Sequence, residues 1–255
     1  MGQDCDIMVA KHNVSRKDQD LFAKRSHDNA EKAWEAGHHQ KEVVPVEIEP
    51  DFKMIKKDNG IRSGTPIEKL SKLKPAFDKK HGTLTAANSS FLTDGSAVCL
   101  IMTESKAKKL GFTPKAEIVD YCFTGQRLED ELLLGPAYAM SKVLDQTKLS
   151  LNDIDVFEIH EAFAGQVLTN IKCLADDEFC KIELQKEKPV GEIDINKVNK
   201  WGGSLSIGHP FGATGARLLT TAANRLIEEN GQYAMLSACA AGAHGHAMII
   251  KKYEG

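Results

Sequence analysis

The order of elements along the chain predicts an α/β protein built from layers of helices and a β-sheet. From about residue 91 onward, short apolar segments with strand character alternate with segments of helical periodicity. This alternation is typical of layered α/β folds. The chain has 255 residues, of which 42% are apolar and 27% charged, the ordinary composition of a globular protein with a sizeable core.

Residues 1–90 have a different character and contain one well-marked helix. Ser15, followed three residues later by Asp18, matches a capping box and predicts the start of a helix over residues 15–37. Its inner face is predicted from small and apolar side chains at helical spacing, namely Phe22, Ser26, Ala30 and Ala33. Small side chains on that face allow another segment to pack closely against the helix.

The remainder of this first region is polar and rich in turn residues and lysine. Weak alternation predicts a strand over residues 43–49, and the Asp-Asn-Gly sequence of residues 58–60 predicts a tight turn. The Thr-Pro-Ile-Glu sequence of residues 65–68 predicts the start of a short helix. We therefore interpret residues 1–90 as a subdomain laid over a core.

After residue 91 the predicted elements follow one another closely. The apolar run 97–102 predicts a strand covered on both faces, and a helix over residues 104–110 is predicted to stop at Gly111. A turn between the last two strands is predicted to hold Cys239. The other predicted elements are strands over residues 116–123, 155–159, 232–238 and 246–252, and helices over residues 136–147, 162–175 and 214–229.

Composition and charge exclude several classes of function. The formal net charge of −3 gives no reason to expect nucleic acid as a partner. No apolar run approaches the ~20 residues of a membrane helix, so any membrane association is expected to be peripheral. The start of the sequence is neither basic nor apolar enough for a signal or transit peptide. The six cysteines include no CxxC pair, so a reducing compartment fits best and neither a zinc ribbon nor a disulfide framework is predicted.

His209 is the first candidate for chemistry. It lies between Gly208 and Pro210, directly before a glycine-rich turn and a helix. Free amides at a helix N-terminus carry positive partial charge, so a histidine there can deprotonate a thiol or stabilise an oxyanion. The alternative is a loop histidine beside a structural glycine turn. The glycine spacing matches neither the Walker motif nor the dinucleotide fingerprint, so no nucleotide site is predicted.

Cys239 is the second candidate. It follows an apolar strand and precedes a run of Ala, Gly and His, where exposed amides can tune a thiol as an acid or base. The alternative is an inert buried cysteine. Cys239, His244 and His246 also suggest a metal site, but the spacing C-x4-H-x-H matches no common zinc site, so none is predicted.

His160 is the third candidate because it ends the predicted strand over residues 155–159. Ligands of open α/β sheets gather at the carboxyl ends of strands. A helix-capping role for His160 or Glu161 is the competing explanation.

Together these residues resemble the motifs of the thiolase family. The resemblance rests on the sequences HEAFA at residues 160–164, GHPFGATG at 208–215 and CAAGAHG at 239–245. The sequence LKPAF, continued by GTLTAANSS, within residues 73–90 is also similar to a thiolase segment. With the helix that follows Ser15, the similarity covers essentially all 255 residues.

The resemblance implies a layered fold of the type α-β-α-β-α, of which this chain would hold a part. Residues 1–90 would be a loop subdomain that covers the active site. Residues 91–114 would close the N-terminal core domain, and residues 115–255 would form the C-terminal thiolase domain.

Within the family, most thiolases have asparagine at the position of His160. A histidine at this position is similar to the β subunits of mitochondrial trifunctional fatty-acid oxidation complexes. The insert around residues 179–199 and the sequence WGGSLS at 201–206 favour the same subfamily. The resemblance implies a 3-ketoacyl-CoA thiolase with CoA and acyl-CoA as substrates and no permanently bound cofactor. It also implies a mitochondrial location, a homodimer of the complete subunit, and an α-subunit partner with hydratase and dehydrogenase activity.

The same resemblance assigns roles to single residues. His209 would activate a nucleophilic cysteine, and Cys239 would protonate departing acetyl-CoA and deprotonate incoming CoA. His160 would orient a water in a first oxyanion site, and the backbone N–H of Ala241 would help to form a second. The pantetheine channel would be lined by Phe77, Ala86, Ser90 and Phe163.

The chain also departs from the family pattern in two ways. Ala241 and Ala243 stand at glycine positions, and alanine is tolerated there only if φ stays negative. The family's nucleophile lies in a cysteine–small–serine motif, a context that is absent around Cys5, Cys99, Cys122, Cys173 and Cys180.

We therefore expect a partial thiolase that lacks its nucleophile and is inactive alone. The alternative is a non-catalytic half-thiolase that binds acyl-CoA or a partner subunit. A decarboxylating ketosynthase relative is disfavoured. Those enzymes use two histidines with one cysteine, and the cysteine at position 239 in the last motif argues against that set.

Overall fold

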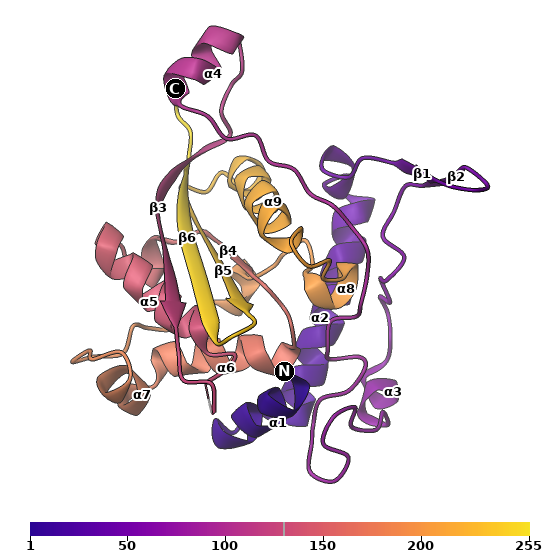
Figure 1. Ribbon diagram of the computed structural model, residues 1–255, viewed down its shortest axis with the longest axis vertical. Coiled ribbons are helices and arrows are strands. Elements are labelled where there is room, and N and C mark those ends of the chain that lie inside the picture. The colour runs from indigo at the N-terminus through magenta and orange to yellow at the C-terminus, as the bar shows by residue number, and fades with distance from the viewer. Residues whose placement is uncertain (130) are drawn as a thin grey trace.

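A four-stranded mixed sheet lies at the centre of the computed structural model, which describes residues 1–129 and 131–255. The strand order is β3-β6-β5-β4, with β4 and β5 parallel and the other pairs antiparallel. Helices α5 and α9 pack on the sheet from opposite sides (Figure 1). These elements are β3 (Ala116–Gly125), β4 (Val156–Ile159), β5 (Tyr233–Ala240), β6 (His244–Lys252), α5 (Gly135–Thr147) and α9 (Thr214–Glu228).

Strand β5 shows why both faces of the sheet are covered. Ala234 and Leu236 pack into a cluster with Leu218 and Ala222 of α9. Met235, between them, points to the other face and joins the larger core cluster that includes α5. Successive side chains of a strand point to opposite faces, so an apolar run such as this one needs a helix on each side.

The N-terminal helices form a further layer beside the sheet. Helix α1 (Gly2–Lys11) packs against α6 (Ala164–Ala175), and α2 (Arg16–Glu35) packs against α6 and the short α8 (Ser204–Ile207). The predicted capping box at the start of α2 is confirmed, since Ser15 Oγ accepts the N–H of Asp18 at 3.1 Å. The predicted inner face of α2 is also confirmed, because its four side chains are buried.

The small residues of α2 permit a close approach of a second segment. At Gly202, where φ is 83°, an added Cβ would lie 2.5 Å from the Cβ of Ala30. Because such a distance is too short for two carbon atoms, glycine is required here. This contact brings the segment that precedes α8 directly onto α2.

A two-stranded hairpin of β1 (Val46–Ile48) and β2 (Lys53–Ile55) projects from the rest of the molecule (Figure 1). Its turn occupies residues 49–52. The tight turn predicted at residues 58–60 is wrong in a separate way, because these residues form an irregular segment with only a bend at Asn59. Helix α3 (Ile67–Ser71) follows, close to the predicted position. The predicted strand at residues 43–49 is confirmed only for its last part.

The strand predicted over residues 97–102 is also wrong. These residues form an extended irregular segment that leads to α4 (Glu104–Leu110), with Val98 89% and Leu100 71% exposed. A strand forms by hydrogen bonding to a neighbour, and among the described residues no strand lies beside this segment. Gly111 ends α4 in the left-handed conformation, as predicted.

Several short helices carry no strong sequence signal and were not predicted. They are α1, α7 (Asp177–Ile182), α8, and the 3-10 helices His39–Lys41 and Ile195–Lys197. The capping box of the short turn Leu151–Asp153 is present at Ser150.

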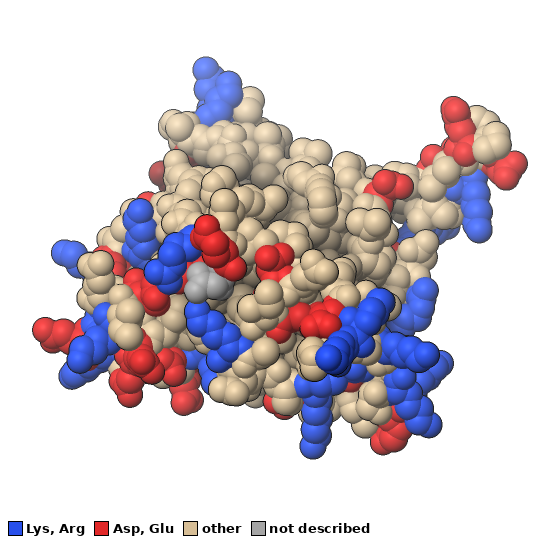
Figure 2. Space-filling model, turned by 60° about the horizontal axis from the view of Figure 1, so that its bottom comes forward, with Lys and Arg blue, Asp and Glu red and all other residues tan. Residues whose placement is uncertain are grey.

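On the face shown in Figure 2, many basic side chains gather at the lower right, and basic and acidic side chains are mixed on the left. In the described part of the chain, no helix has the length and apolar character required to cross a bilayer.

Candidate active site

The predicted functional residues gather at the carboxyl ends of the parallel strands β4 and β5. His160 directly follows β4, and its backbone N–H donates to the carbonyl of Ser237 on β5 at 2.8 Å. Cys239 lies two residues further along β5, where it pairs with Gly245 of β6. The prediction that a turn holds Cys239 is therefore wrong, because the strand continues through Ala240 and the turn occupies residues 241–243.

The two candidate histidines lie against each other. The ring centroids of His160 and His209 are 4.0 Å apart, and the ring planes are tilted by 39°. His209 belongs to the loop between α8 and α9, and its ring also contacts that of Phe211 at 4.7 Å. Two loops that are distant in sequence thus bring two imidazoles into direct contact.

A buried or half-buried hydroxyl contacts each imidazole. Ser204 Oγ, on the first residue of α8, lies 2.9 Å from Nδ1 of His160. Thr214 Oγ1, on the first residue of α9, lies 2.7 Å from Nδ1 of His209. In the described part of the chain, Nε2 of neither histidine has a hydrogen-bond partner. The Nε2 atoms are therefore the ones available to a substrate.

Burial keeps both histidines neutral. The pKa of His160 lies well below its usual value because its ring is fully buried, and the charges of His209 and Arg217 lower it further. The pKa of His209 is also lowered, first by partial burial and then by the positive charge of Arg217. A neutral imidazole can act as a base or as a neutral hydrogen-bond donor.

Arg217 is the partly exposed member of a charged group with Glu158 and Arg225. Its Nη1 lies 3.7 Å from Glu158 Oε2, and Arg225 Nη1 lies 2.7 Å from Glu158 Oε1. Burial raises the pKa of Glu158 to about 7, although both arginines oppose this shift. Glu158 and Arg225 are fully buried, and Arg225 also pairs with Glu229 at 2.8 Å, so the buried charges compensate one another.

Glu161 anchors the loop that carries His160. Its carboxylate is fully buried and accepts hydrogen bonds from Ser26 Oγ at 2.7 Å, Asn199 Nδ2 at 2.7 Å and the Leu205 amide at 3.1 Å. These donors come from α2, from the last residue of the insert, and from α8. Glu161 therefore holds three parts of the chain together next to the histidine pair.

The thiol of Cys239 is protonated in this environment. Complete burial raises its pKa to about 12. Cys5 on α1 is also buried, and its pKa is raised first by burial and then by the charge that Cys239 would carry. A protonated thiol can donate a proton to a carbanion, whereas it is a poor nucleophile until deprotonated.

The two alanines of the turn after Cys239 differ in backbone conformation. Ala241 keeps a negative φ and so meets the condition for an alanine at a glycine position, and no hydrogen bond from its amide is found among the described residues. Ala243 adopts φ 56°, so it does not meet that condition and occupies the left-handed conformation that glycine favours. Its carbonyl accepts the N–H of Gln126 at 2.9 Å, a contact that holds the turn in place.

Three of the four residues predicted to line the channel lie beside the His160 loop. The rings of Phe77 and Phe163 meet edge to face at 5.8 Å, and the amide of Ser90 donates to Ala162 O at 2.9 Å. The fourth residue, Ala86, lines a separate cavity of about 540 Å³. That cavity also contains the basic side chains Lys24, His27, Arg62 and Lys69, and the apolar side chains Ala23, Leu70, Ala87, Phe91 and Leu205.

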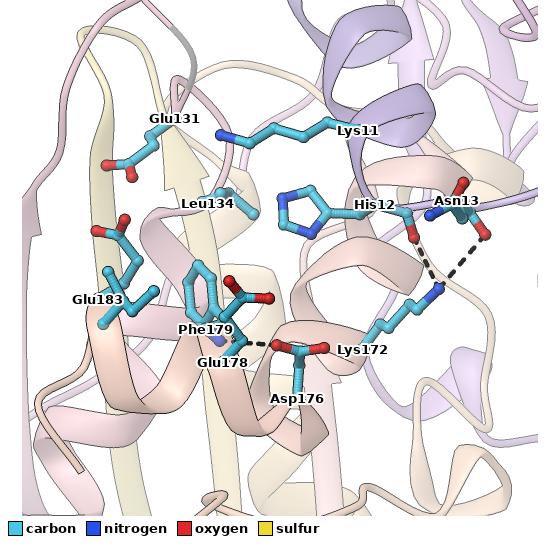
Figure 3. Close-up of a pocket in the computed structure, with 11 residues that line it drawn as sticks. Lys11, His12, Asn13, Glu131, Leu134, Lys172, Asp176, Glu178, Phe179 and Glu183 are labelled. Atoms are coloured by element: carbon cyan, nitrogen blue, oxygen red, sulfur yellow. Dashed lines mark hydrogen bonds between the residues drawn. The ribbon is translucent and has the colours of Figure 1, made fainter.

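A second cavity, of about 430 Å³, lies where α1, α6 and α7 meet (Figure 3). Lys172 Nζ donates to the carbonyl of His12 there at 2.7 Å, and the ring of Phe179 lies beside that of His12. None of the residues predicted for the active site lines this cavity. Among the described residues, no three His, Cys, Asp or Glu side chains come together in a way that could hold a metal ion.

The structure adds residues to the site that sequence reasoning did not single out. Ser204 and Thr214 contact the histidines, and Arg217 lies close enough to influence both. Thr214 could have been suspected from its place at the predicted start of α9. Ser204 lies in a helix of four residues without a periodic signal, so the chain pattern alone could not reveal it.

Comparison with known proteins identifies the fold. The family models described as "Thiolase, N-terminal domain" and "Thiolase, C-terminal domain" match residues 1–105 and 112–252. A probable 3-ketoacyl-CoA thiolase of Caenorhabditis elegans is 54% identical over 254 residues, 99% of this chain and 56% of that protein. The mitochondrial trifunctional enzyme subunit beta of Rattus norvegicus is 51% identical over 253 residues, 99% of this chain and 53% of that protein. The chain thus spans just over half the length of these two relatives.

Solved structures agree with these matches. A Bacillus anthracis acetyl-CoA acetyltransferase superposes with a TM-score of 0.86 at 37% identity, covering 99% of this chain and 60% of that one. Human mitochondrial 3-ketoacyl-CoA thiolase in complex with CoA gives a TM-score of 0.80 at 32% identity, covering 98% of this chain and 58% of that one. The likeness therefore extends over nearly the whole chain.

Proposed function

Since the chain belongs to the thiolase family, we propose that it supplies the base, acid and oxyanion groups of a 3-ketoacyl-CoA thiolase of fatty-acid oxidation. The observation that carries this proposal is the contact of His160 with His209 at the strand ends, with Cys239 on the neighbouring strand. The names of the relatives from Caenorhabditis elegans and Rattus norvegicus support the substrate class.

The proposed reaction is the thiolysis of a 3-ketoacyl-CoA. A cysteine thiol, deprotonated by Nε2 of His209, attacks carbon 3 of the substrate. The bond between carbons 2 and 3 breaks, and its electron pair goes to carbon 2 of the leaving acetyl-CoA, which the Cys239 thiol protonates. The Cys239 thiolate then takes the proton of an incoming CoA thiol, whose sulfur attacks the acyl thioester and releases the nucleophilic cysteine.

Two groups would stabilise the negative oxygens formed in these steps. The ring of His160 lies against that of His209, and its Nε2 has no protein partner among the described residues, so Nε2 can donate to a water or an oxyanion. The amide of Ala241 has the same freedom at the turn after Cys239. Removal of a single donor of this kind typically raises a reaction barrier by ~3–4 kcal/mol.

The nucleophilic cysteine is proposed to come from a segment outside these 255 residues. No cysteine–small–serine motif occurs in the sequence, and in the described part of the chain no cysteine is hydrogen-bonded to His160 or His209. On this proposal the chain alone does not catalyse thiolysis. Residues 1–90 act as the loop subdomain, 91–114 close the N-terminal core and 115–255 form the C-terminal domain.

The cavity lined by Ala86 is proposed to bind the CoA part of the substrate. Lys24, Arg62 and Lys69 offer positive charge for its phosphate groups. Ala86 and Leu205 offer an apolar wall for the pantetheine arm. Phe77, Ser90 and Phe163 are proposed to line the inner end of that arm next to His160.

The relatives also suggest the setting of the protein. Mitochondrial trifunctional enzyme beta subunits are about half identical to this chain, which supports a mitochondrial location and a hetero-oligomer with a hydratase/dehydrogenase α subunit. A homodimer of the complete subunit and, at most, peripheral membrane association belong to the same proposal.

The test is to isolate the native polypeptide from its source with an antibody against this chain, without denaturation, and to measure mass and thiolysis together. We expect an assembly that contains more than the 28.0 kDa of this chain and converts 3-ketoacyl-CoA. His209→Ala or Cys239→Ala should lower its rate by ~10²-fold or more. A product of 28.0 kDa that binds acyl-CoA without turnover would instead establish the alternative, a non-catalytic half-thiolase that binds acyl-CoA or a partner subunit.

A further inference from the structure

The hydroxyl of Ser204 has a single possible acceptor. Ser204 is fully buried, and its Oγ lies 2.9 Å from Nδ1 of His160. No other hydrogen bond of this hydroxyl is found among the described residues. A buried hydroxyl that leaves its proton unbound loses about 1–3 kcal/mol, so the Ser204 proton points to Nδ1. A neutral imidazole that accepts at Nδ1 carries its own proton on Nε2.

The hydroxyl of Thr214 has two possible acceptors. Its Oγ1 lies 2.7 Å from Nδ1 of His209 and 3.4 Å from the carbonyl oxygen of Pro210. The Pro210 carbonyl can only accept. Thr214 can therefore donate to Pro210 and accept the N–H of His209 Nδ1 at the same time. In that arrangement Nε2 of His209 carries the lone pair that a general base needs.

We propose that Ser204 and Thr214 are positioning residues that hold the two histidines in opposite tautomers, His160 with its proton on Nε2 and His209 with its proton on Nδ1. The tautomer of His160 is assigned from Ser204, because Nδ1 of His160 is the one acceptor found among the described residues for the Ser204 hydroxyl proton. The assignment for His209 rests additionally on the proposed function, because only a bare Nε2 can take the proton of a thiol.

Opposite tautomers give two identical side chains different tasks at one pH. His160 presents an N–H to a water or an oxyanion, and His209 presents a lone pair to a thiol. When His209 takes the proton, its Nδ1–H bond to Thr214 is unchanged, so no hydroxyl has to rotate during the step. The 4.0 Å contact of the rings holds the donor and the base beside one substrate.

Both rings must stay neutral for this distinction to exist. Burial and the charge of Arg217 lower the pKa of each histidine, which supports neutrality at physiological pH. A charge on His209 would further disfavour protonation of His160, since it contributes to the lowered pKa of His160.

The test is a long-range 1H–15N correlation spectrum of the purified protein with labelled histidine, which reports which ring nitrogen carries the proton. The chain has nine histidines, so the signals lost in His160→Gln and those lost in His209→Asn identify the two rings. We expect His160 to be protonated at Nε2 and His209 at Nδ1. The same tautomer at both residues would overturn the proposal, and the unsubstituted protein decides this point by itself.

Variants then test the hydroxyls. Ser204→Ala should convert His160 from one dominant tautomer to a mixture and leave His209 unchanged, and Thr214→Val should do the reverse. Thr214→Ser keeps the hydroxyl and should keep the tautomer. An unchanged His160 tautomer in a folded Ser204→Ala protein would remove Ser204 from this role, and an unchanged His209 tautomer in Thr214→Val would remove Thr214.

Activity provides a separate readout in the complete assembly. Thr214→Val should lower kcat by about 10²-fold or more, as expected for a base in the wrong tautomer, and Thr214→Ser should restore most of it. The spectra need no turnover, so the two proposals can fail independently. Opposite tautomers without thiolysis would reject only the proposed function, and thiolysis with equal tautomers would reject only this inference.

Discussion

Ser26 Oγ donates a 2.7 Å hydrogen bond to Oε2 of Glu161 across a sequence separation of 135 residues. The contact is fully buried and joins the long helix α2 to the loop that carries His160. The N-terminal layer is therefore part of the scaffold of the active site and not only a cover over it.

Ser26→Ala should destabilise the protein by about 1–3 kcal/mol, because a buried carboxylate would lose one of its donors. Urea denaturation of the purified protein measures this change. Ser71→Ala is the matched control, since Ser71 is exposed and donates only to Glu68 O in its own helix. The exposed site should change stability by less than about 0.5 kcal/mol. Equal losses in the two variants would contradict the scaffold role of Ser26.

Gly203→Ala should be more damaging than its small size suggests. An added Cβ would lie 2.3 Å from Cδ of Glu161, so the carboxylate would have to leave its donors. We expect a loss of about 3 kcal/mol in the free energy of unfolding. Gly215→Ala is the control, because nothing lies within 4 Å of its Cβ position on α9, and alanine should stabilise the helix there by about 0.5–1 kcal/mol. A tolerated Gly203→Ala would show that Glu161 can move without cost.

His39 should make stability depend on pH below neutrality. Its ring is buried and its Nε2 lies 2.8 Å from Trp201 O, and burial lowers its pKa to about 4 from 6.5. The unfolded chain then binds the proton more strongly than the folded one, so stability is lost as pH falls from about 6.5 towards 4. Between about pH 7 and about pH 4.5 this histidine should account for about 2 kcal/mol.

The measurement for His39 is the difference between the unsubstituted protein and His39→Gln in urea denaturation at the two pH values. A difference is needed because Glu158 titrates in the same range with the opposite sign. Its pKa is raised to about 7, so its contribution to stability falls as pH rises. If His39→Gln loses as much stability on acidification as the unsubstituted protein, His39 does not titrate as described.

The basic side of the larger cavity should control the affinity for CoA. In the complete assembly, the double variant Arg62→Ala, Lys69→Ala should raise KM for CoA about tenfold with little change in kcat, because these cations line the cavity and neither His160 nor His209 does. Lys108→Ala is the control, since Lys108 pairs with Glu104 on α4 and does not line the cavity. A fall in kcat at constant KM would place the CoA phosphates elsewhere.

Much of the central sheet and its helices follows from local patterns. Capping signals mark the start of α2 at Ser15 and the end of α4 at Gly111, and a continuous apolar run marks the buried strand β5. Residues 97–102 have the same apolar pattern as a buried strand but are exposed here. The pattern of apolar residues shows that a segment could form a buried strand. It does not show whether a neighbouring strand is present to pair with it.

Part of the candidate site could likewise be predicted from local sequence, and part could not. His160, His209 and Cys239 were predicted because small residues surround them at the ends of predicted elements. The hydrogen bonds to Ser204 and Thr214 depend on how two loops meet in space. A serine in a loop has many possible partners, so the sequence cannot select among them.

The exposed segment that leads to α4 also touches the turn of the proposed base. At Gly208, where φ is 92°, an added Cβ would lie 2.4 Å from Thr93, and at Gly95 an added Cβ would lie 2.8 Å from Pro210. These contacts hold the two residues that flank His209 against residues 93–95. A displacement of residues 93–95 would therefore be transmitted through non-bonded contacts to the loop that carries the imidazole.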